Sequence, residues 1–294
     1  MKILLCSDGH APAERAARFV CSATAAAGAE ITLLGIIEHP SDESALGESL
    51  RRSADLLRRQ NLPVEIITRN GKPLAEIQRR TQEERYDLVA IGAERKPGGP
   101  FALSAKAQHV MKEVEPPVLA VIGERTDVKK ALICSGGGRS IEKAVELTAC
   151  LLAKSSVSVT LLHVLAEAPV IYSDLLNEEA ESRNLLAANS TLARNLRSEL
   201  GRLGAANLPA DIKLRHGLVT TQILRELHEG SYDLVIAGSA PTAGALRTYV
   251  MGDITSEILS RADCAVLVVR SAPAPAPGFL ARFGKWFRQT PRKP

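Results

Sequence analysis

Two short segments of the sequence hold residue types that could act on a ligand. Ser7-Asp8-Gly9-His10 contains the residue types of a catalytic triad, and residues 135–140 read Ser-Gly-Gly-Gly-Arg-Ser. A triad needs a base that points at the nucleophile and an acid behind the base, which adjacent residues do not supply. Three glycines that enter a helix could let backbone N–H groups approach a phosphate, with Arg139 as an added cation. The alternative, which we favour, is a flexible turn from a strand into a helix.

The spacing of cysteine and histidine residues does not indicate a metal site or a disulfide framework. The five cysteines form no Cys-x-x-Cys pair, and the six histidines form no pair four residues apart. Such cysteines are typical of buried apolar side chains in a reducing compartment. The N-terminal apolar run is too short for a signal peptide, and no stretch approaches the roughly 18 apolar residues that span a bilayer. We therefore expect a cytoplasmic protein without a metal.

The charge of the chain is concentrated at its C-terminal end. The formal net charge is +4, but residues 273–294 contain five basic residues and no acidic one. Without those five cations the rest of the chain is close to neutral. A nucleic-acid-binding surface needs a basic face or stripe, so we expect no nucleic-acid partner.

The elements that must position these segments occur twice in the chain. Five apolar runs recur in the same order, each pair in a matching context: residues 2–9 and 130–137, 31–37 and 157–164, 64–71 and 211–217, 86–92 and 232–238, and 117–122 and 265–269. Apolar strands that alternate with helices indicate a parallel sheet covered on both faces. Right-handed connections then predict two tandem doubly wound α/β domains, each a five-stranded parallel sheet with a ligand crevice at the carboxyl ends of its strands.

We predict domain boundaries at residues 1–125 and 126–272, here called the first and second copy, followed by a Pro/Ala linker and basic aromatic tail at 273–294. The connection near residues 124–128 is only a few residues long, so the copies should lie against each other as an internal pseudo-dimer. Whether two chains also pair through their last strands as a homodimer stays open. The main asymmetry is a helical insertion in the second copy, at about residues 173–204.

Four motifs follow one another along the copies: Asp8-Gly9 after the first strand, Arg-x-Gly at 69–71 and 215–217, Asp-Leu-Val-x-x-Gly at 87–92 and 233–238, and Pro-Val-Leu-Ala-Val at 117–121. Taken in this order, the motifs resemble the universal stress protein (UspA) family in a tandem form. The resemblance covers nearly the full length of both copies and leaves out residues 273–294. It implies an adenine nucleotide alpha hydrolase-like fold and a non-catalytic stress-response protein that binds a ligand or a partner protein; many members of the family bind ATP.

The family's ATP loop, Gly-x2-Gly-x9-Gly-Ser/Thr after the fourth strand, is incomplete in the first copy. Asp8, which the resemblance places at the adenosine, is kept, and so is Gly92. Ser104 and Ala105 stand where Gly-Ser should open the last helix, and Glu94 brings negative charge toward a phosphate. The resemblance therefore implies a degenerate ATP site here.

The second copy departs from the pattern differently. It keeps Gly238, Ser239 and Gly252, but Asp253 stands where the hydroxyl should be. An aspartate is a good helix N-cap, yet its carboxylate would repel a phosphate. Ser135 replaces the aspartate of the first strand. This site is also degenerate, with an ATP cofactor as its implied ligand.

A second resemblance keeps an enzymatic alternative open. Residues 135–140 are similar to the Ser-Gly-Gly-x-Asp-Ser pyrophosphate loop of ATP pyrophosphatases, with Arg139 in place of the aspartate. It implies a nucleotide phosphate hydrolase or transferase with Gly136 and Gly137 at the phosphate. Because the sequence offers that enzyme no convincing base or pair of metal-binding carboxylates, we favour a protein that is not an enzyme.

The tail suggests a third function. Residues 279–288 hold three of the five phenylalanines and the only tryptophan. On a helix, Phe279, Phe283 and Trp286 would share one face, with basic residues around the other. Such a helix suits peripheral membrane contact or a groove on a partner. The alternatives are that the tail docks on its own domains or has no fixed structure.

Overall fold

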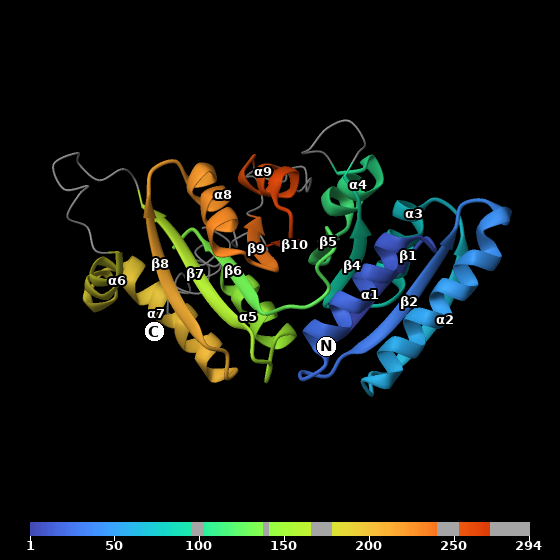
Figure 1. Ribbon diagram of the computed structural model, residues 1–294, viewed down its shortest axis with the longest axis horizontal. Helices are drawn as coiled ribbons and strands as arrows, with labels where there is room; N and C mark the ends of the chain where they lie inside the picture. The colour runs from blue at the N-terminus through green and yellow to red at the C-terminus, as the bar shows by residue number, and fades with distance from the viewer. Residues whose placement is uncertain (96–102, 138–140, 166–177, 240–252, 271–294) are drawn as a thin grey trace, which may run out of the picture.

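The computed structural model describes residues 1–95, 103–137, 141–165, 178–239 and 253–270 (Figure 1). Within them the strands form one ten-stranded sheet in the order β3-β2-β1-β4-β5-β10-β9-β6-β7-β8. The tail at 279–288 lies outside these residues, so its contact with a membrane or a partner stays a prediction. None of the helices in the described ranges is both long enough and apolar enough to cross a membrane.

The first copy begins with an apolar strand and then alternates helices and strands. Its order across the sheet is 3-2-1-4-5, and each neighbouring pair in that half is parallel. The elements are β1 (Lys2–Ser7), α1 (Ala11–Thr24), β2 (Glu30–Ile37), the 3-10 helix η1 (Pro40–Asp42), α2 (Glu43–Arg59), β3 (Val64–Asn70), α3 (Pro73–Glu83), β4 (Leu88–Ala93), α4 (Ala105–Glu113) and β5 (Val118–Ile122).

The second copy repeats this order and adds one helix. The predicted insertion falls on α6 and α7, of which α7 is the counterpart of α2, and α6 is the addition. The elements are β6 (Lys130–Ser135), α5 (Glu142–Leu151), β7 (Ser158–Leu165), α6 (Glu178–Ala187), α7 (Thr191–Ala205), β8 (Ala210–His216), α8 (Val219–Gly230), β9 (Leu234–Ser239), α9 (Asp253–Arg261) and β10 (Ala265–Arg270).

The two predicted parallel sheets are confirmed, and the structure joins them edge to edge. Strand β10 runs antiparallel to β5, with Leu267 opposite Leu119. The apolar last strands of the two copies cover each other's edges, which would otherwise expose unpaired backbone groups.

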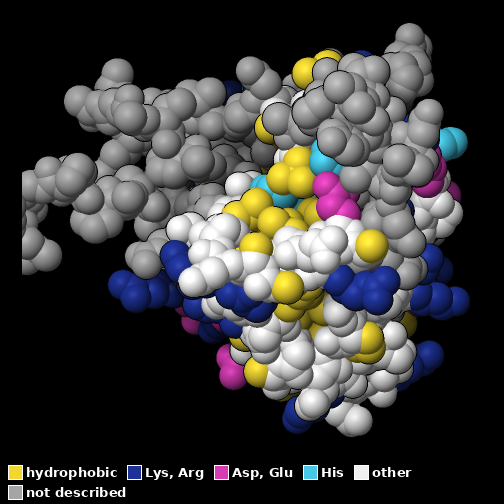
Figure 2. All heavy atoms as spheres, turned by 90° about the vertical axis from the view of Figure 1, so that its left-hand side faces the viewer, with side chains coloured by type: hydrophobic (Ala, Val, Ile, Leu, Met, Phe, Trp, Pro, Cys, Tyr) yellow, Lys and Arg dark blue, Asp and Glu magenta, His cyan; other side chains and the backbone are white. Residues whose placement is uncertain are grey.

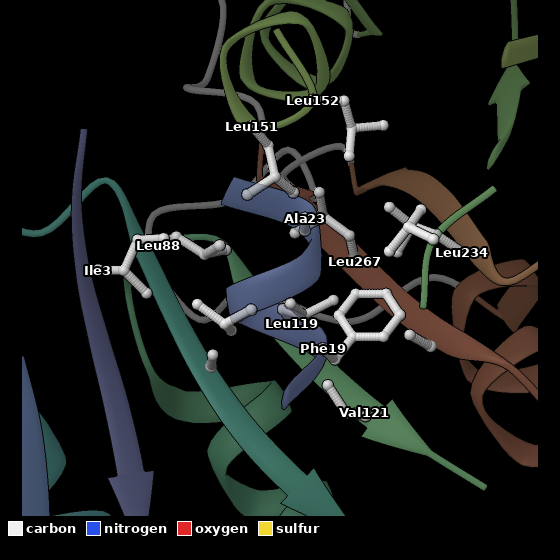
Figure 3. Packing of buried hydrophobic residues seen from close by; sticks show 14 of the residues in the cluster. Ile3, Phe19, Ala23, Leu88, Leu119, Val121, Leu151, Leu152, Leu234 and Leu267 are labelled. Carbon is white, nitrogen blue, oxygen red and sulfur yellow. The ribbon is translucent and has the colours of Figure 1, made fainter. Parts of the chain in front are cut away.

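The core continues across this junction on both faces of the sheet. In β1, Ile3 and Leu5 belong to one apolar cluster, whereas Leu4 and Cys6 belong to the other. Each cluster contains residues of both copies. Figure 3 shows the first cluster, in which Phe19 of α1 lies near Leu119 and Leu267. Strands that are apolar throughout thus bury both of their faces, as the sequence predicts.

Two arginines tie the copies together beside the β5–β10 pair. Arg95, just after β4, donates to the carbonyl of Ser260 at the end of α9, at 2.6 Å, and to that of Ala262. Arg270, the last residue of β10, donates to the carbonyls of residues 111, 112 and 114 at the end of α4. The last carbonyls of a helix have no partner within the helix, so each arginine satisfies groups that would otherwise be orphaned.

Figure 2 shows the outer end of the second copy, where β8 forms the edge of the sheet. Apolar side chains gather there between basic ones. Leu218 and Val219, at the turn from β8 into α8, expose 74% and 41% of their surfaces. In the first copy the corresponding positions are Lys72 and Pro73, next to α3. The two ends of the sheet therefore differ in surface chemistry although they share a fold.

Candidate functional site

A cleft opens in the first copy at the carboxyl ends of β1 and β4. This is the point at which the strand order reverses, where doubly wound sheets bind ligands. Apolar side chains of Ile36, Ile77 and Ile91 line it from one side. Its polar lining comes from Ser7, Asp8, Glu38, Ser104 and Lys106.

The turn after β1 presents Asp8 to the cleft. The Ser7 hydroxyl accepts a hydrogen bond from the Gly9 N–H at 3.2 Å, and Asp8 Oδ1 accepts one from the His10 N–H at 3.1 Å. Gly9 has φ +85°, and a Cβ there would lie 3.0 Å from the backbone of Leu46. Both Asp8 and His10 are exposed, and Ser7 is bonded to the backbone of Gly9. The turn therefore exposes a carboxylate, with the His10 ring 3.4 Å from it. Within these four described residues no hydrogen bond joins the His10 ring to the Ser7 hydroxyl, which a catalytic triad would need.

Gly92 has a packing role that brings α1 to the cleft. A Cβ at this position would lie 2.1 Å from the carbonyl carbon and oxygen of Pro12. Only glycine allows this approach, because no side chain fits into so short a gap. The N-terminal turn of α1 therefore lies directly against β4 at the cleft.

The opposite wall of the cleft is the N-terminus of α4. Ser104 caps the helix, with its hydroxyl accepting from the Ala107 N–H at 3.3 Å. Lys106 lies in the first turn and donates from Nζ to the carboxylate of Glu38, just after β2. The helix N-terminus and the lysine both favour an anion here. Glu94, expected to oppose a phosphate, instead lies 3.5 Å from the guanidinium of Arg15.

The corresponding turn of the second copy corrects one prediction. Its Gly137 N–H donates to the Ser135 hydroxyl at 3.1 Å, as Gly9 does to Ser7. Both serines end their strands, β6 and β1. Ser135 is therefore the counterpart of Ser7, and Gly136 stands in the place of Asp8. The second copy lacks the carboxylate, as expected, but the residue that replaces it is Gly136.

Helix α7 packs closely onto this turn. The carboxyl of Glu199 accepts from the Ser135 hydroxyl at 3.0 Å, and Asn195 donates to the carbonyl of Gly137 at 2.7 Å. Gly137 has φ +70°, and a Cβ there would lie 2.3 Å from Leu192 Cδ1. Burial raises the pKa of the Glu199 carboxyl to about 7. The N–H of Gly137, expected at a phosphate, therefore already has an acceptor within the protein.

Two of the other predicted residues of the second copy lie at the same edge of the sheet. Gly238 and Ser239 end β9, in register with Val269 and Arg270 of β10. Asp253 is the first residue of α9. Gly252 and residues 138–140 lie outside the described ranges. The role of these residues at a ligand stays a prediction.

Sequence reasoning missed three charged residues of these sites: Glu38, Lys106 and Glu199. Lys106 could have been found, because a cation is disfavoured in the first turn of a helix and points to a nearby anion. Glu199 could not, because 64 residues separate it from Ser135.

Comparison with known proteins agrees with this architecture. The Universal stress protein family matches residues 1–121 and again residues 128–270. None of the curated proteins searched matches the chain.

Two solved structures share the fold over nearly the whole chain. A universal stress protein from Archaeoglobus fulgidus DSM 4304 has a TM-score of 0.67 at 16% identity, covering 92% of this chain and 98% of that one. A functionally unknown protein from Pseudomonas aeruginosa PAO1 has a TM-score of 0.59 at 17% identity, covering 98% and 97%. This chain belongs to the universal stress protein family and carries two family domains in tandem.

Proposed function

We propose that this protein is a non-catalytic, cytoplasmic stress-response protein that binds an adenine nucleotide in the cleft of its first copy. The observation that supports it most is that one cleft is lined both by the exposed carboxylate of Asp8 and by the cation Lys106 at the N-terminus of α4. A carboxylate suits the hydroxyls of a ribose, and a lysine at a helix N-terminus suits a phosphate.

The walls of the cleft fit the remaining part of such a ligand. Ile36, Ile77 and Ile91 offer an apolar surface on which a base can lie. Ligand sites of this kind are mostly apolar, with a few polar groups that fix orientation. Gly92 also lines the cleft and lets α1 pack close to it.

The proposal leaves the second copy without a nucleotide. Gly136 offers no carboxylate for a ribose, and the Gly137 N–H is bonded to Ser135. The buried carboxyl of Glu199 lies behind the same turn. The family glycines Gly238 and Gly252 are more complete here than in the first copy, but the turn after β6 does not support binding.

Titration calorimetry of the full chain with adenosine, AMP and ATP tests this assignment. We expect one site per chain. Asp8→Ala should weaken binding by about tenfold, since it removes a hydrogen bond to a charged group worth ~1.5 kcal/mol. Gly136→Ala changes the equivalent position of the second copy and should leave binding unchanged.

If Gly136→Ala abolishes binding and Asp8→Ala does not change it, the nucleotide binds in the second copy and not in the first. If none of the three ligands gives a heat signal at millimolar concentration, the protein binds no adenine nucleotide. Phosphate release from ATP that Arg139→Ala abolishes would favour the alternative of a hydrolase that uses residues 135–140.

A further inference from the structure

We propose that the cleft of the first copy selects a ligand with a single phosphate group, because Glu38 competes with the ligand for Lys106. This inference rests on the proposed function, since it specifies which adenine compound the cleft takes. It assigns to Glu38 a role in specificity.

The ion pair between these residues spans the cleft. Lys106 extends from the first turn of α4, and its Nζ donates to Glu38, which follows β2. Both residues line the cleft, with side chains that expose 65% and 26% of their surfaces. Because a lysine lies unfavourably at the positive end of a helix dipole, the carboxylate of Glu38 offsets that charge in the unliganded protein. Glu38 thus occupies the position that an anionic group of a ligand would take.

The charges around the cleft limit how much negative charge it accepts. Among its described lining residues, Asp8 and Glu38 are acidic and Lys106 alone is basic. The carboxylate of Glu94, outside the lining, already lies near Arg15. One phosphate can replace Glu38 on Lys106. Further phosphates would add charge beside two carboxylates, and the described lining holds no second cation to offset it. Like charges that lie close together repel.

The second copy lacks both members of the pair. Ile254 is the second residue of α9, as Lys106 is of α4, and it exposes 41% of its surface. Ala166 follows β7 in sequence as Glu38 follows β2. The repeat therefore replaces the anion and the cation together, which is consistent with a shared role in the first copy.

The test is calorimetric titration of the full chain with adenosine, AMP and ATP, in the wild type and in Glu38→Gln. We expect AMP to bind the wild type about tenfold more tightly than ATP. Glu38→Gln removes one carboxylate and keeps the side chain's shape. It should tighten ATP binding by about three- to tenfold, tighten AMP less, and leave adenosine unchanged. Glu115→Gln, an exposed change on the segment before β5, is the matched control and should change nothing.

Lys106→Met tests independently whether Lys106 binds the phosphate. It should reduce AMP binding to the level of adenosine, and thermal melting of each variant confirms that it is folded.

If adenosine binds the wild type but AMP and ATP bind equally, and Glu38→Gln leaves their ratio unchanged, selection by Glu38 is wrong while the proposed function stands. If no adenine compound binds the wild type or Glu38→Gln, both conclusions fail together. If ATP binds more tightly than AMP and Glu38→Gln weakens it, Glu38 is a ligand-binding residue and not a competitor.

Discussion

The hydroxyl of Ser135 donates a 3.0 Å hydrogen bond to the carboxyl of Glu199, and this contact joins the end of β6 to the middle of α7. The first copy has no equivalent carboxyl. Leu46 contacts Gly9 as Leu192 contacts Gly137, so counting along α2 places Ser53 where α7 has Glu199. One copy thus carries a buried ionisable group where the other carries a buried hydroxyl.

We predict that Glu199→Gln stabilises the protein at alkaline pH and has little effect at acid pH. Burial raises the pKa of Glu199 from 4.5 to about 7, so the folded state holds the proton more tightly than the unfolded chain. The contribution of Glu199 to stability is therefore complete below about pH 4.5 and is lost as the pH rises toward 7. The amide keeps an acceptor for Ser135 without a charge. At pH 8 the variant should gain about 2–3 kcal/mol.

Thermal melting at pH 5 and pH 8 measures this difference. Glu115→Gln, at an exposed position, should melt like the wild type at both pH values. A Glu199→Gln variant that melts below the wild type at pH 8 would contradict the prediction, because the ionised carboxyl would then be stabilising.

Gly92 and Gly136 were both predicted as ligand-site glycines, and they should differ sharply when replaced by alanine. At Gly92 a Cβ would lie 2.1 Å from the Pro12 carbonyl, so α1 must shift. At Gly136 a Cβ meets no atom within 4 Å. We expect Gly92→Ala to cost about 2 kcal/mol or more, as overpacking does, and Gly136→Ala to change stability by less than ~0.5 kcal/mol. Urea unfolding followed by circular dichroism distinguishes the two. Equal unfolding midpoints for the two variants would contradict this prediction, because they would mean that α1 can move away from β4 without a loss of stability.

The fold could be predicted further than the sites. Runs such as residues 88–93 and 234–238 are apolar throughout, and a buried parallel strand satisfies that pattern between helices. The repeat then showed that the same five strands occur twice, in the same order along the chain. From the sequence alone, Ser135 is matched to Asp8 instead of Ser7, because Ser7 and Asp8 are adjacent and both polar. The hydrogen bonds that the Gly9 and Gly137 N–H groups donate to Ser7 and Ser135 show that these two serines are equivalent.

Contacts between distant segments could not be predicted. Glu38 meets Lys106 across a cleft whose two walls are 68 residues apart in the chain, and Arg95 reaches Ser260 across 165 residues. Charge pattern alone does not select one partner among so many acidic and basic residues. The antiparallel β5–β10 pair also depends on how the two copies are oriented toward each other. The hydrophobic periodicity of the sequence does not predict that orientation.

We predict that Arg270→Met loosens the junction between the copies. The guanidinium of Arg270 is buried and donates to the carbonyls of Met111 and Lys112 at 2.6 and 2.7 Å, and to that of Val114. Methionine fills a similar volume but leaves these carbonyls unpaired. Each buried unsatisfied group costs about 1–3 kcal/mol, so we expect a loss of ~3 kcal/mol. Hydrogen exchange should increase in α4 and β5, whereas Arg18→Met, at an exposed position of α1, should change neither. An increase in hydrogen exchange that is confined to α9 would contradict the prediction that Arg270 stabilises the end of α4.

Glu226 of α8 is buried together with Arg215 of β8. Its carboxylate accepts from Arg215 Nε and from the hydroxyl of Tyr232, both at 2.7 Å, and lies 2.9 Å from Lys213 Nζ. Burial acts to raise the pKa of Glu226, but the hydrogen bonds from Lys213, Tyr232 and Arg215 outweigh it, and the pKa is lowered. The stability that Glu226 contributes is therefore present above about pH 4.5 and is lost as the pH falls.

Glu226→Gln should consequently destabilise the protein at pH 7 by about 3 kcal/mol, because it leaves Arg215 buried with less negative charge. The gap to the wild type should narrow as the pH falls below about 4.5 and through the lowered pKa of the wild-type carboxylate, because protonation removes its charge. Glu229→Gln, in which the altered carboxyl is more exposed and screened by solvent, should cost less than Glu226→Gln. In the first copy Arg80 stands in the place of Glu226 and pairs with Glu84, so the sign of the central charge is reversed. A destabilisation of Glu226→Gln that is the same at every pH would mean that packing, and not the charge, is what Arg215 requires.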